Sequence, residues 1–259
     1  MKYLIIKFGG SVLEELPFSF YQDIVDIQRR GEWKPVIVHG GGPLISELLT
    51  QLNIETTFVN GMRKTTSDVL DVVEMVLSGK VNKQVVRTLK QAGGQAIGMS
   101  GVDGDLLQAS PLQDSALGYV GQVEEVNIYL IKQVVEQDLI PVISPIGLDE
   151  QGERYNINGD VAAAAVAKAL GGKLCFVSNI PGIYKEVEGV KQILTQVTKP
   201  EVEEMIVSGD IKEGMIPKVK AALEALMFAV PEVVILNGKE KGSLVSFTSG
   251  NEIGTKVVL

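Results

Sequence analysis

The sequence predicts an α/β protein whose central sheet is mainly parallel and covered by helices on both faces. Along the 259-residue chain, short apolar runs alternate with amphipathic stretches of helical length. The runs are apolar on both strand faces, as strands are when helices cover both sides of a sheet. Sheets of this kind place ligands beyond the carboxyl ends of their strands.

The first elements are expected in a regular order. The strand "YLIIKF" precedes a helix from about Phe18 to Arg30, and the strand "PVIVH" precedes a helix from about Pro43 to Leu52. Later strands are expected in "QAIGM", "LIPVISPI", "KLCFVSNI" and "EVVILN". Residues 108–126 read as strands and turns, and "LDEQGERYNI" reads as a polar hairpin. A helix follows in "NGDVAAAAVAKALGG", with Asp160 in its first turn, where the helix dipole favours a carboxylate.

The segment from Thr66 to Leu77 predicts a helix with more apolar residues than one face needs. Five of them share one face, whereas Leu70 and Met75 fall elsewhere. The helix is therefore either buried on two sides or placed at a subunit interface. No linker or internal repeat divides the chain, so any two lobes share one sheet, with a division near residues 165–175.

Composition narrows the class of protein. The net charge of −8 argues against a general nucleic-acid binder, which normally carries a basic surplus. The lone cysteine, Cys175, lies in an apolar run and is expected to be a small buried residue. No apolar run is long enough for a membrane span, and the first strand is too short for a signal peptide, which predicts a cytoplasmic protein.

Glycine clusters follow two of the expected strands. Gly9 and Gly10 follow the first strand, and Gly40, Gly41 and Gly42 follow the second. Glycine lets a ligand approach the backbone, and free N–H groups at a helix start bind anions. One such pair is equally compatible with an ordinary tight turn. Two clusters on consecutive strands favour an anion site, although neither matches the patterns GxxxxGK[ST] or GxGxxG.

Three cations are candidates for binding an anion. Lys7 interrupts a buried strand, where a lysine is costly unless it meets an anion. Lys218 lies near a helix start, where a bound phosphate would reverse its unfavourable interaction with the dipole. Arg63 follows a turn, and its guanidinium can donate two parallel hydrogen bonds to one carboxylate.

The set of candidate functional residues favours phosphoryl transfer to a carboxylic acid. Cations, backbone amides and one organising carboxylate suit a reaction that depends on positioning and charge neutralisation. The sequence contains no GxSxG motif and no His/Cys metal cluster, and His39 is its only histidine. A carboxylate acceptor is already ionised at neutral pH and needs no general base. We therefore expect His39 to be a packed residue that ends its strand, with the neighbouring glycines as the functional part.

Six motifs together resemble the amino-acid kinase family. They are "IIKFGGS", "VIVHGGGP", "NGMRKT", "YNINGDVAAAAVA", "VSNIPGI" and "GMIPKVKAA", they occur in the family's order, and they span essentially the whole chain. The resemblance implies an open three-layer αβα sandwich, with an acyl-amino-acid lobe over residues 1–170 and an ATP lobe over residues 171–259. It is greatest to the branch in which ATP phosphorylates the γ-carboxylate of N-acetyl-L-glutamate, the second step of arginine biosynthesis. It also implies homodimers, and Mg²⁺ that arrives bound to ATP rather than in a metal site of the protein.

The resemblance also implies roles for individual residues. Lys7 and Lys218 would contact the transferring phosphoryl group, with Asp160 holding both lysines. Backbone amides in the two glycine loops would assist at the phosphoryl group, namely those of Gly9, Gly10 and Gly41. The acyl amino acid would be bound by Gly41, Gly42, Arg63 and Asn156. The nucleotide would lie along Ser178, Asn179, Met215 and Lys218.

Two departures from the family pattern and several alternatives remain. Asn179 stands where the family often has Asp, and the extra amino-terminal helix of arginine-inhibited hexameric members is not seen, which favours a dimer. An acyl-aminoadipate kinase is the nearest alternative, but that branch resembles "RYTD" where this chain has "RKTT". Carbamate and glutamate 5-kinases are more distant. A catalytically silent amino-acid-binding regulator is disfavoured because Lys7, Lys218 and Asp160 are all present.

Overall fold

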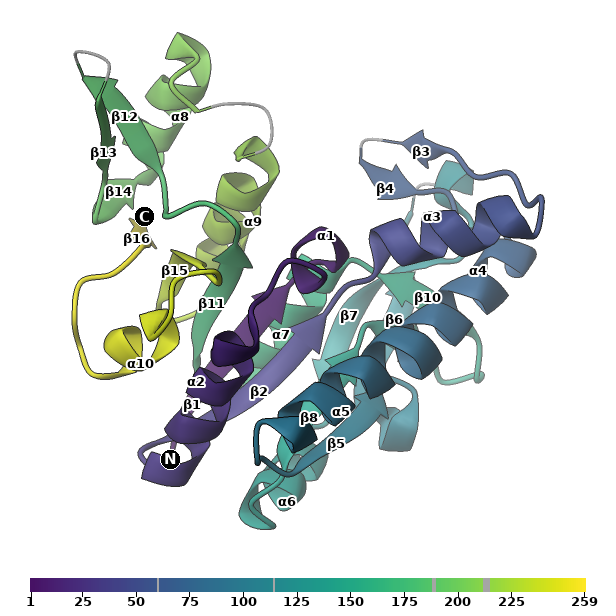
Figure 1. Ribbon diagram of the computed structural model, residues 1–259. Coiled ribbons are helices and arrows are strands. Elements are labelled where there is room, and N and C mark those ends of the chain that lie inside the picture. The colour runs from purple at the N-terminus through teal and green to yellow at the C-terminus, as the bar shows by residue number, and fades with distance from the viewer. Residues whose placement is uncertain (60, 114, 188–189, 212–214) are drawn as a thin grey trace.

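The computed structural model describes residues 1–59, 61–113, 115–187, 190–211 and 215–259, and within them eight strands form the central sheet (Figure 1). In spatial order these are β14 (Gln196–Thr198), β16 (Thr255–Val258), β15 (Val233–Asn237), β11 (Lys173–Ser178), β1 (Lys2–Phe8), β2 (Trp33–His39), β8 (Ile140–Ser144) and β5 (Ala96–Ser100). All neighbouring pairs are parallel except β15 and β16. The mainly parallel sheet expected from the sequence is confirmed.

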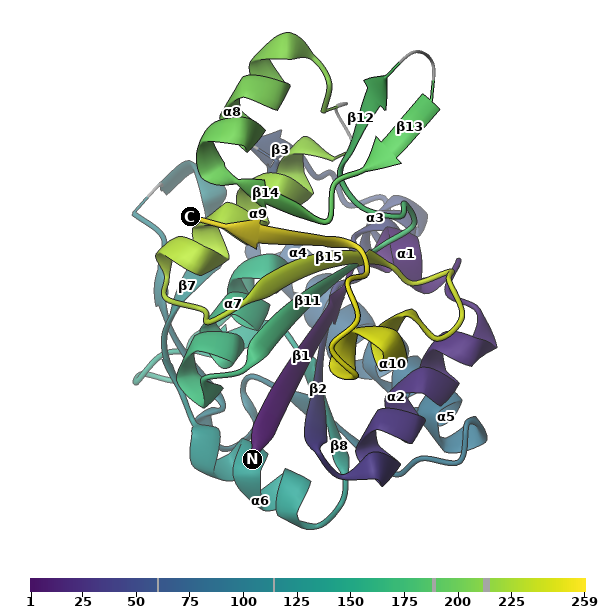
Figure 2. The same ribbon diagram turned by 90° about the vertical axis from the view of Figure 1, so that its left-hand side faces the viewer.

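Helices cover both faces of this sheet (Figure 2). One face carries α2 (Phe18–Arg30), α5 (Asn82–Gln91) and α10 (Ser243–Thr248), and the other carries α6 (Ile128–Glu136), α7 (Gly159–Leu170) and α9 (Ile216–Met227). Alternate residues of β1 enter two separate cores, Leu4 and Ile6 on the α2 side and Tyr3 and Ile5 on the α7 side. The three-layer arrangement is thereby confirmed, and Lys7 shares the α7 side of the strand.

A small closed barrel stands beside the sheet. Its strands are β6 (Leu107–Pro111), β7 (Val120–Val126), β9 (Ile146–Leu148) and β10 (Arg154–Ile157), with 3₁₀ turns at Asp103–Asp105 and Ser115–Leu117. Strands β9 and β10 form the hairpin expected from "LDEQGERYNI", and β6 pairs antiparallel with β7. Asp114, within the expected strand-and-turn region, lies outside the described residues.

The apolar helix expected at residues 66–77 is the first part of a longer helical segment. It runs through α4 (Ser67–Glu74), a π-helical stretch η1 (Met75–Val81) and α5. The Thr66 side chain caps its start by accepting a hydrogen bond from the Val69 N–H. Leu70 is buried like the residues of the main apolar face, so the helix is indeed buried on two sides. Met75 is 56% exposed.

The remaining elements lie at the ends of the sheet. They are α1 (Gly10–Leu13), α3 (Gly42–Gln51), the hairpins β3 (Phe58–Val59)–β4 (Met62–Arg63) and β12 (Tyr184–Val187)–β13 (Val190–Ile193), and α8 (Lys199–Ser208). Helix α2 has the bounds expected from the sequence, and α3 agrees within one residue. Cys175 is buried in the core, as expected. Within the described ranges, every helix is too short or too polar to cross a membrane.

Candidate functional site

Three central strands deliver their following loops to one edge of the sheet. Phe8 of β1 pairs with His39 of β2 on one side and with Val177 of β11 on the other. The segments that begin at Gly9, Gly40 and Asn179 therefore leave the sheet side by side. This is the carboxyl edge, where the sequence predicted the ligand site.

The two glycine loops touch each other through their backbones. A Cβ added at Gly10 would lie 2.8 Å from the Cα of Gly41, and a Cβ at Gly41 would lie 2.7 Å from the Leu77 side chain. Neither position has room for a side chain. Gly41 is also the N-cap of α3 and supplies no side-chain cap, so the first N–H groups of that helix are available to an anion.

Lys7 is held by an ion pair with Asp160. The strand periodicity directs Lys7 toward α7, and its Nζ lies 2.5 Å from Oδ1 of Asp160. Asp160 is fixed in turn because Asn158, the N-cap of α7, accepts a hydrogen bond from the Asp160 N–H at 2.8 Å. The Lys7 side chain is only 14% exposed. The buried lysine of the first strand thus has a defined counter-ion at the start of a helix.

Lys218 approaches the same region from α9. It lies in the first turn of that helix, and its Nζ donates a hydrogen bond to Oγ of Ser178 at 2.9 Å. Burial lowers the pKa of Lys218, the nearby Lys7 ammonium lowers it further, and Asp160 opposes both effects. Among the described residues, no carboxylate lies within 4.0 Å of Lys218. Because the Lys7 and Lys218 ammonium groups repel each other, a bound anion would be favoured near them.

Except for Lys218, the residues predicted for the acceptor and phosphoryl sites line one cavity of about 480 Å³, here called the glycine-loop cavity. It is bounded by the ends of β1 and β2, the start of α3, the β3–β4 hairpin and the β10–α7 connection. The predicted residues in its lining are Lys7, Gly9, Gly10, Gly41, Gly42, Arg63, Asn156 and Asp160. Asn60 and Gly214, which begin two of the six motifs, lie outside the described residues.

Arg63 is a buried cation that has only neutral partners among the described residues. Its guanidinium donates to Oγ of Ser46 at 2.7 Å, to the Gly42 carbonyl at 3.2 Å and to Oγ1 of Thr56 at 3.2 Å, and it lies over the Phe58 ring. Arg63 is 8% exposed, and burial lowers its pKa, although an arginine stays protonated at neutral pH. A buried guanidinium without an anion is costly, so it is well suited to bind a carboxylate.

Thr65 connects Arg63 with Asn156. Asn156 Nδ2 donates to Oγ1 of Thr65 at 3.1 Å, and that hydroxyl donates to the Arg63 carbonyl at 2.9 Å. The roles of Thr65, Ser46 and Asn158 were not expected from the sequence. The position of Asn158 directly before the 159–170 helix is a recognisable N-cap signal, whereas nothing local marks the roles of Thr65 and Ser46.

A second, smaller cavity of about 200 Å³, here called the β11–α9 cleft, has Lys218 but not Lys7 in its lining. Its lining consists of Asn179, Ile180, Ile183, Tyr184, Asp210, Ile211, Met215 and Lys218. Three of the four predicted nucleotide residues are in this lining. The fourth, Ser178, is fully buried and binds Lys218. Asn179 donates a long hydrogen bond of 3.4 Å to Glu15.

His39 is a packed residue, as expected. It is fully buried, its Nε2 faces Nδ2 of Asn82 at 3.2 Å, and its Nδ1 faces the Gly40 carbonyl at 3.2 Å. Because the Asn82 amide is a donor, Nε2 accepts and Nδ1 carries the proton. Burial lowers the pKa of His39 from 6.5 to about 4, so the ring is neutral near pH 7. It stabilises the turn that begins the glycine loop.

The fold and this edge define a class of α/β proteins that carry glycine loops at the carboxyl ends of central parallel strands. A family model described as "Amino acid kinase family" matches residues 2–237. The chain belongs to the amino acid kinase family, which confirms the resemblance seen in the motifs.

Individual relatives cover nearly the whole chain. It is 47% identical over 255 residues to an acetylglutamate kinase of Oceanobacillus iheyensis, covering 98% of this chain and 96% of the relative. It is 48% identical over 258 residues to an acetylglutamate kinase of Geobacillus kaustophilus, with 98% of each chain covered. Among solved structures, smu.665 of Streptococcus mutans superposes with a TM-score of 0.82 at 30% identity, covering 99% of this chain and 98% of that one.

Proposed function

We propose that this protein is an acetylglutamate kinase, which transfers the γ-phosphoryl group of ATP to the γ-carboxylate of N-acetyl-L-glutamate in the second step of arginine biosynthesis. The names of the relatives confirm the kinase activity expected from the sequence. The structural observation that carries the proposal is the buried Arg63, which has only neutral described partners and lies in the same cavity as the Lys7–Asp160 pair.

The acceptor is positioned by its other polar groups. Arg63 binds the α-carboxylate through its guanidinium, which Ser46 and Thr56 hold in one orientation. Asn156 and the backbone amides of Gly41 and Gly42 line the same cavity and contact the acyl amino acid there. This arrangement directs the γ-carboxylate toward Lys7.

The transfer itself needs no general base. An oxygen of the ionised γ-carboxylate forms a bond to the γ-phosphorus, the bond from that phosphorus to the β,γ-bridging oxygen breaks, and ADP leaves with the electron pair. The difficulty is repulsion between two anions, which Lys7, Lys218 and the amides of Gly9, Gly10 and Gly41 reduce by neutralising charge. Asp160 holds Lys7 directly, and its charge also acts on Lys218.

The nucleotide occupies the β11–α9 cleft, along Ser178, Asn179, Met215 and Lys218. Residues 1–170 then form the acyl-amino-acid lobe and residues 171–259 the ATP lobe of one sheet. Mg²⁺ supplies charge neutralisation at the ATP phosphates and arrives bound to them. A magnesium ion bound in this way takes most of its ligands from phosphate oxygens and water and needs few from the protein.

A homodimer in the cytoplasm completes the proposal. The exposed Met75, on a helix whose other apolar residues are buried, supports a subunit contact at α4 and η1. An acyl-aminoadipate kinase remains the second candidate, because the cavity would also admit a slightly longer acyl chain.

Trapping the acyl phosphate with hydroxylamine tests the proposal. The full chain, ATP and Mg²⁺ are incubated with N-acetyl-L-glutamate, glutamate, N-acetyl-aminoadipate or carbamate, and hydroxamate formation is measured. We expect hydroxamate with N-acetyl-L-glutamate at a kcat/KM well above that of the other acids. ATP turnover with carbamate alone, or with none of the four, would contradict the assignment.

A further inference from the structure

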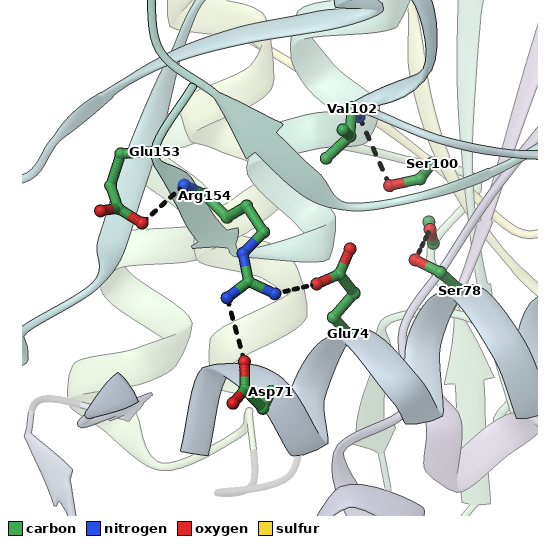
Figure 3. Close-up of polar contacts among 8 residues, drawn as sticks. Asp71, Glu74, Ser78, Ser100, Val102, Glu153 and Arg154 are labelled. Atoms are coloured by element: carbon green, nitrogen blue, oxygen red, sulfur yellow. Dashed lines mark hydrogen bonds and ion pairs between the residues drawn. The ribbon is translucent and has the colours of Figure 1, made fainter. Parts of the chain in front are cut away.

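An arginine of β10 that the reaction does not use bridges two carboxylates of α4 (Figure 3). Nη2 of this arginine, Arg154, lies 2.9 Å from Oδ1 of Asp71, and its Nη1 pairs with the Glu74 carboxylate. Asp71 and Glu74 are three residues apart and therefore share one face of the helix. Arg154 and these two carboxylates are called the Arg154 clamp below.

The clamp lies beside the acceptor-binding residues. Arg154 and Asn156 are two residues apart on β10 and so project from the same side of the strand. Arg154 reaches the middle of α4, and Asn156 reaches Thr65, just before that helix. Arg63, which faces the acceptor, lies two residues before Thr65. The two contacts therefore join β10 to the Arg63–α4 segment at two points.

The backbone supports the same connection. The Thr65 N–H donates to the Leu117 carbonyl at 2.8 Å, and the Tyr119 N–H donates to the Thr65 carbonyl at 2.7 Å. The Asn156 N–H in turn donates to the Tyr119 carbonyl at 2.9 Å. Residues 117–119 thus bridge Thr65 and Asn156, but these hydrogen bonds end before α4 begins. The Arg154 clamp is the polar contact that joins β10 to the middle of α4.

We propose that the Arg154 clamp is a positioning device for the acceptor: it fixes the spacing between Arg63 and Asn156 and thereby sets the affinity for the acyl amino acid. This inference rests on the proposed function for its substrate. Arg154 touches neither reactant and acts through α4 and Thr65. A planar guanidinium suits this task because its fork reaches both carboxylates at once, whereas a lysine ammonium would reach one of them well.

The test compares Arg154→Met with the full-length wild type. We expect KM for N-acetyl-L-glutamate to rise roughly tenfold while KM for ATP changes less than about twofold, because the displacement is confined to the acceptor cavity. Arg154→Lys should give an intermediate KM. Adding Glu74→Gln to Arg154→Met should raise KM no further, since both changes break the same contact. A KM for the acceptor equal to that of the wild type, or an equal rise in both KM values, would overturn the proposal.

Lys173→Met is the matched control. Lys173 has the same side-chain exposure as Arg154, 33%, and pairs with Glu232 at 2.9 Å, but it lies at the opposite end of the sheet strands. We expect it to leave both KM values unchanged, although either variant lowers Tm by about 2–4 °C.

Amide hydrogen exchange of the ligand-free protein separates the two proposals. Exchange at residues 65–70 should be faster in Arg154→Met and unchanged in Lys173→Met. Unchanged exchange in Arg154→Met would overturn the clamp whatever the substrate is. If exchange is faster in Arg154→Met but the wild type does not phosphorylate N-acetyl-L-glutamate, the result would support the clamp and contradict only the proposed function.

Discussion

The glycine-loop cavity contains Lys7, the β11–α9 cleft contains Lys218, and the two are built in different ways. The cavity is formed by backbone loops in contact and by charged side chains that hydrogen bonds or ion pairs hold in place, as with Arg63 and Lys7. The cleft is lined mainly by apolar side chains, with Asn179 at its exposed edge. Charged groups held in fixed positions discriminate among small acids by the positions of the acids' carboxylates. Apolar side chains that pack against the planar adenine of a nucleotide impose fewer geometric requirements.

This difference predicts that selectivity for the acceptor depends on the glycine-loop cavity. A substitution that disturbs the cavity should affect the acceptor or the transfer step strongly, and the nucleotide little.

Gly10→Ala should have the largest effect. The added methyl would meet the Gly41 backbone at 2.8 Å, so the two glycine loops must separate and the amides lose their alignment with the phosphoryl group. We expect kcat to fall by about 100-fold or more in a steady-state assay. Gly79→Ala is the control, because Gly79 lies in η1 with open space around its Cβ position. Turnover within about twofold of wild type in Gly10→Ala would show that the loop contact is not needed.

Arg63→Met should mainly weaken acceptor binding. It removes the guanidinium proposed to bind the α-carboxylate, so KM for N-acetyl-L-glutamate should rise about 10- to 100-fold with KM for ATP nearly unchanged. Lys64→Met, at the exposed neighbouring position, is the control and should behave like the wild type. An equal rise in both KM values would contradict a separation of the two binding sites.

His39→Asn should leave activity almost unchanged and alter stability with pH. The pKa of His39 is lowered to about 4 in the folded protein, so between pH 6.5 and 4 the unfolded chain binds a proton that the folded one does not. The His39 contribution to the free energy of unfolding should therefore decrease by about 2 kcal/mol from pH 7.5 to pH 5. Urea unfolding at both pH values measures whether the variant lacks this decrease. A catalytic ionisation near pH 6.5 that disappears in the variant would contradict a structural role.

The sequence predicted the site best where local rules act. Strand alternation places Lys7 on the α7 side, strand ends place the glycine loops on one edge, and helix starts place Asp160 and Lys218. Each of these placements depends on strand periodicity or on the end of a helix or strand, and a few neighbouring residues determine both.

Contacts between distant segments could not be predicted in the same way. The order of the eight strands depends on packing among helices, and the four-stranded barrel on pairing between β6, β7, β9 and β10. The π-helical stretch at Met75–Val81 has no simple periodic signature, although it brings Leu77 against Gly41. The Arg154 clamp joins residues about 80 positions apart, and neither side has a motif.

The most direct test of the central claim is single-turnover kinetics of Lys218→Ala, because Lys218 lines the β11–α9 cleft and interacts electrostatically with Lys7 and Asp160 of the glycine-loop cavity. We predict that the rate constant for phosphoryl transfer falls by about 100-fold or more while the affinities for ATP and N-acetyl-L-glutamate change less than about threefold. Lys220→Ala, two residues further along α9 and exposed, should react at the wild-type rate. A near-wild-type transfer rate in Lys218→Ala would contradict the account.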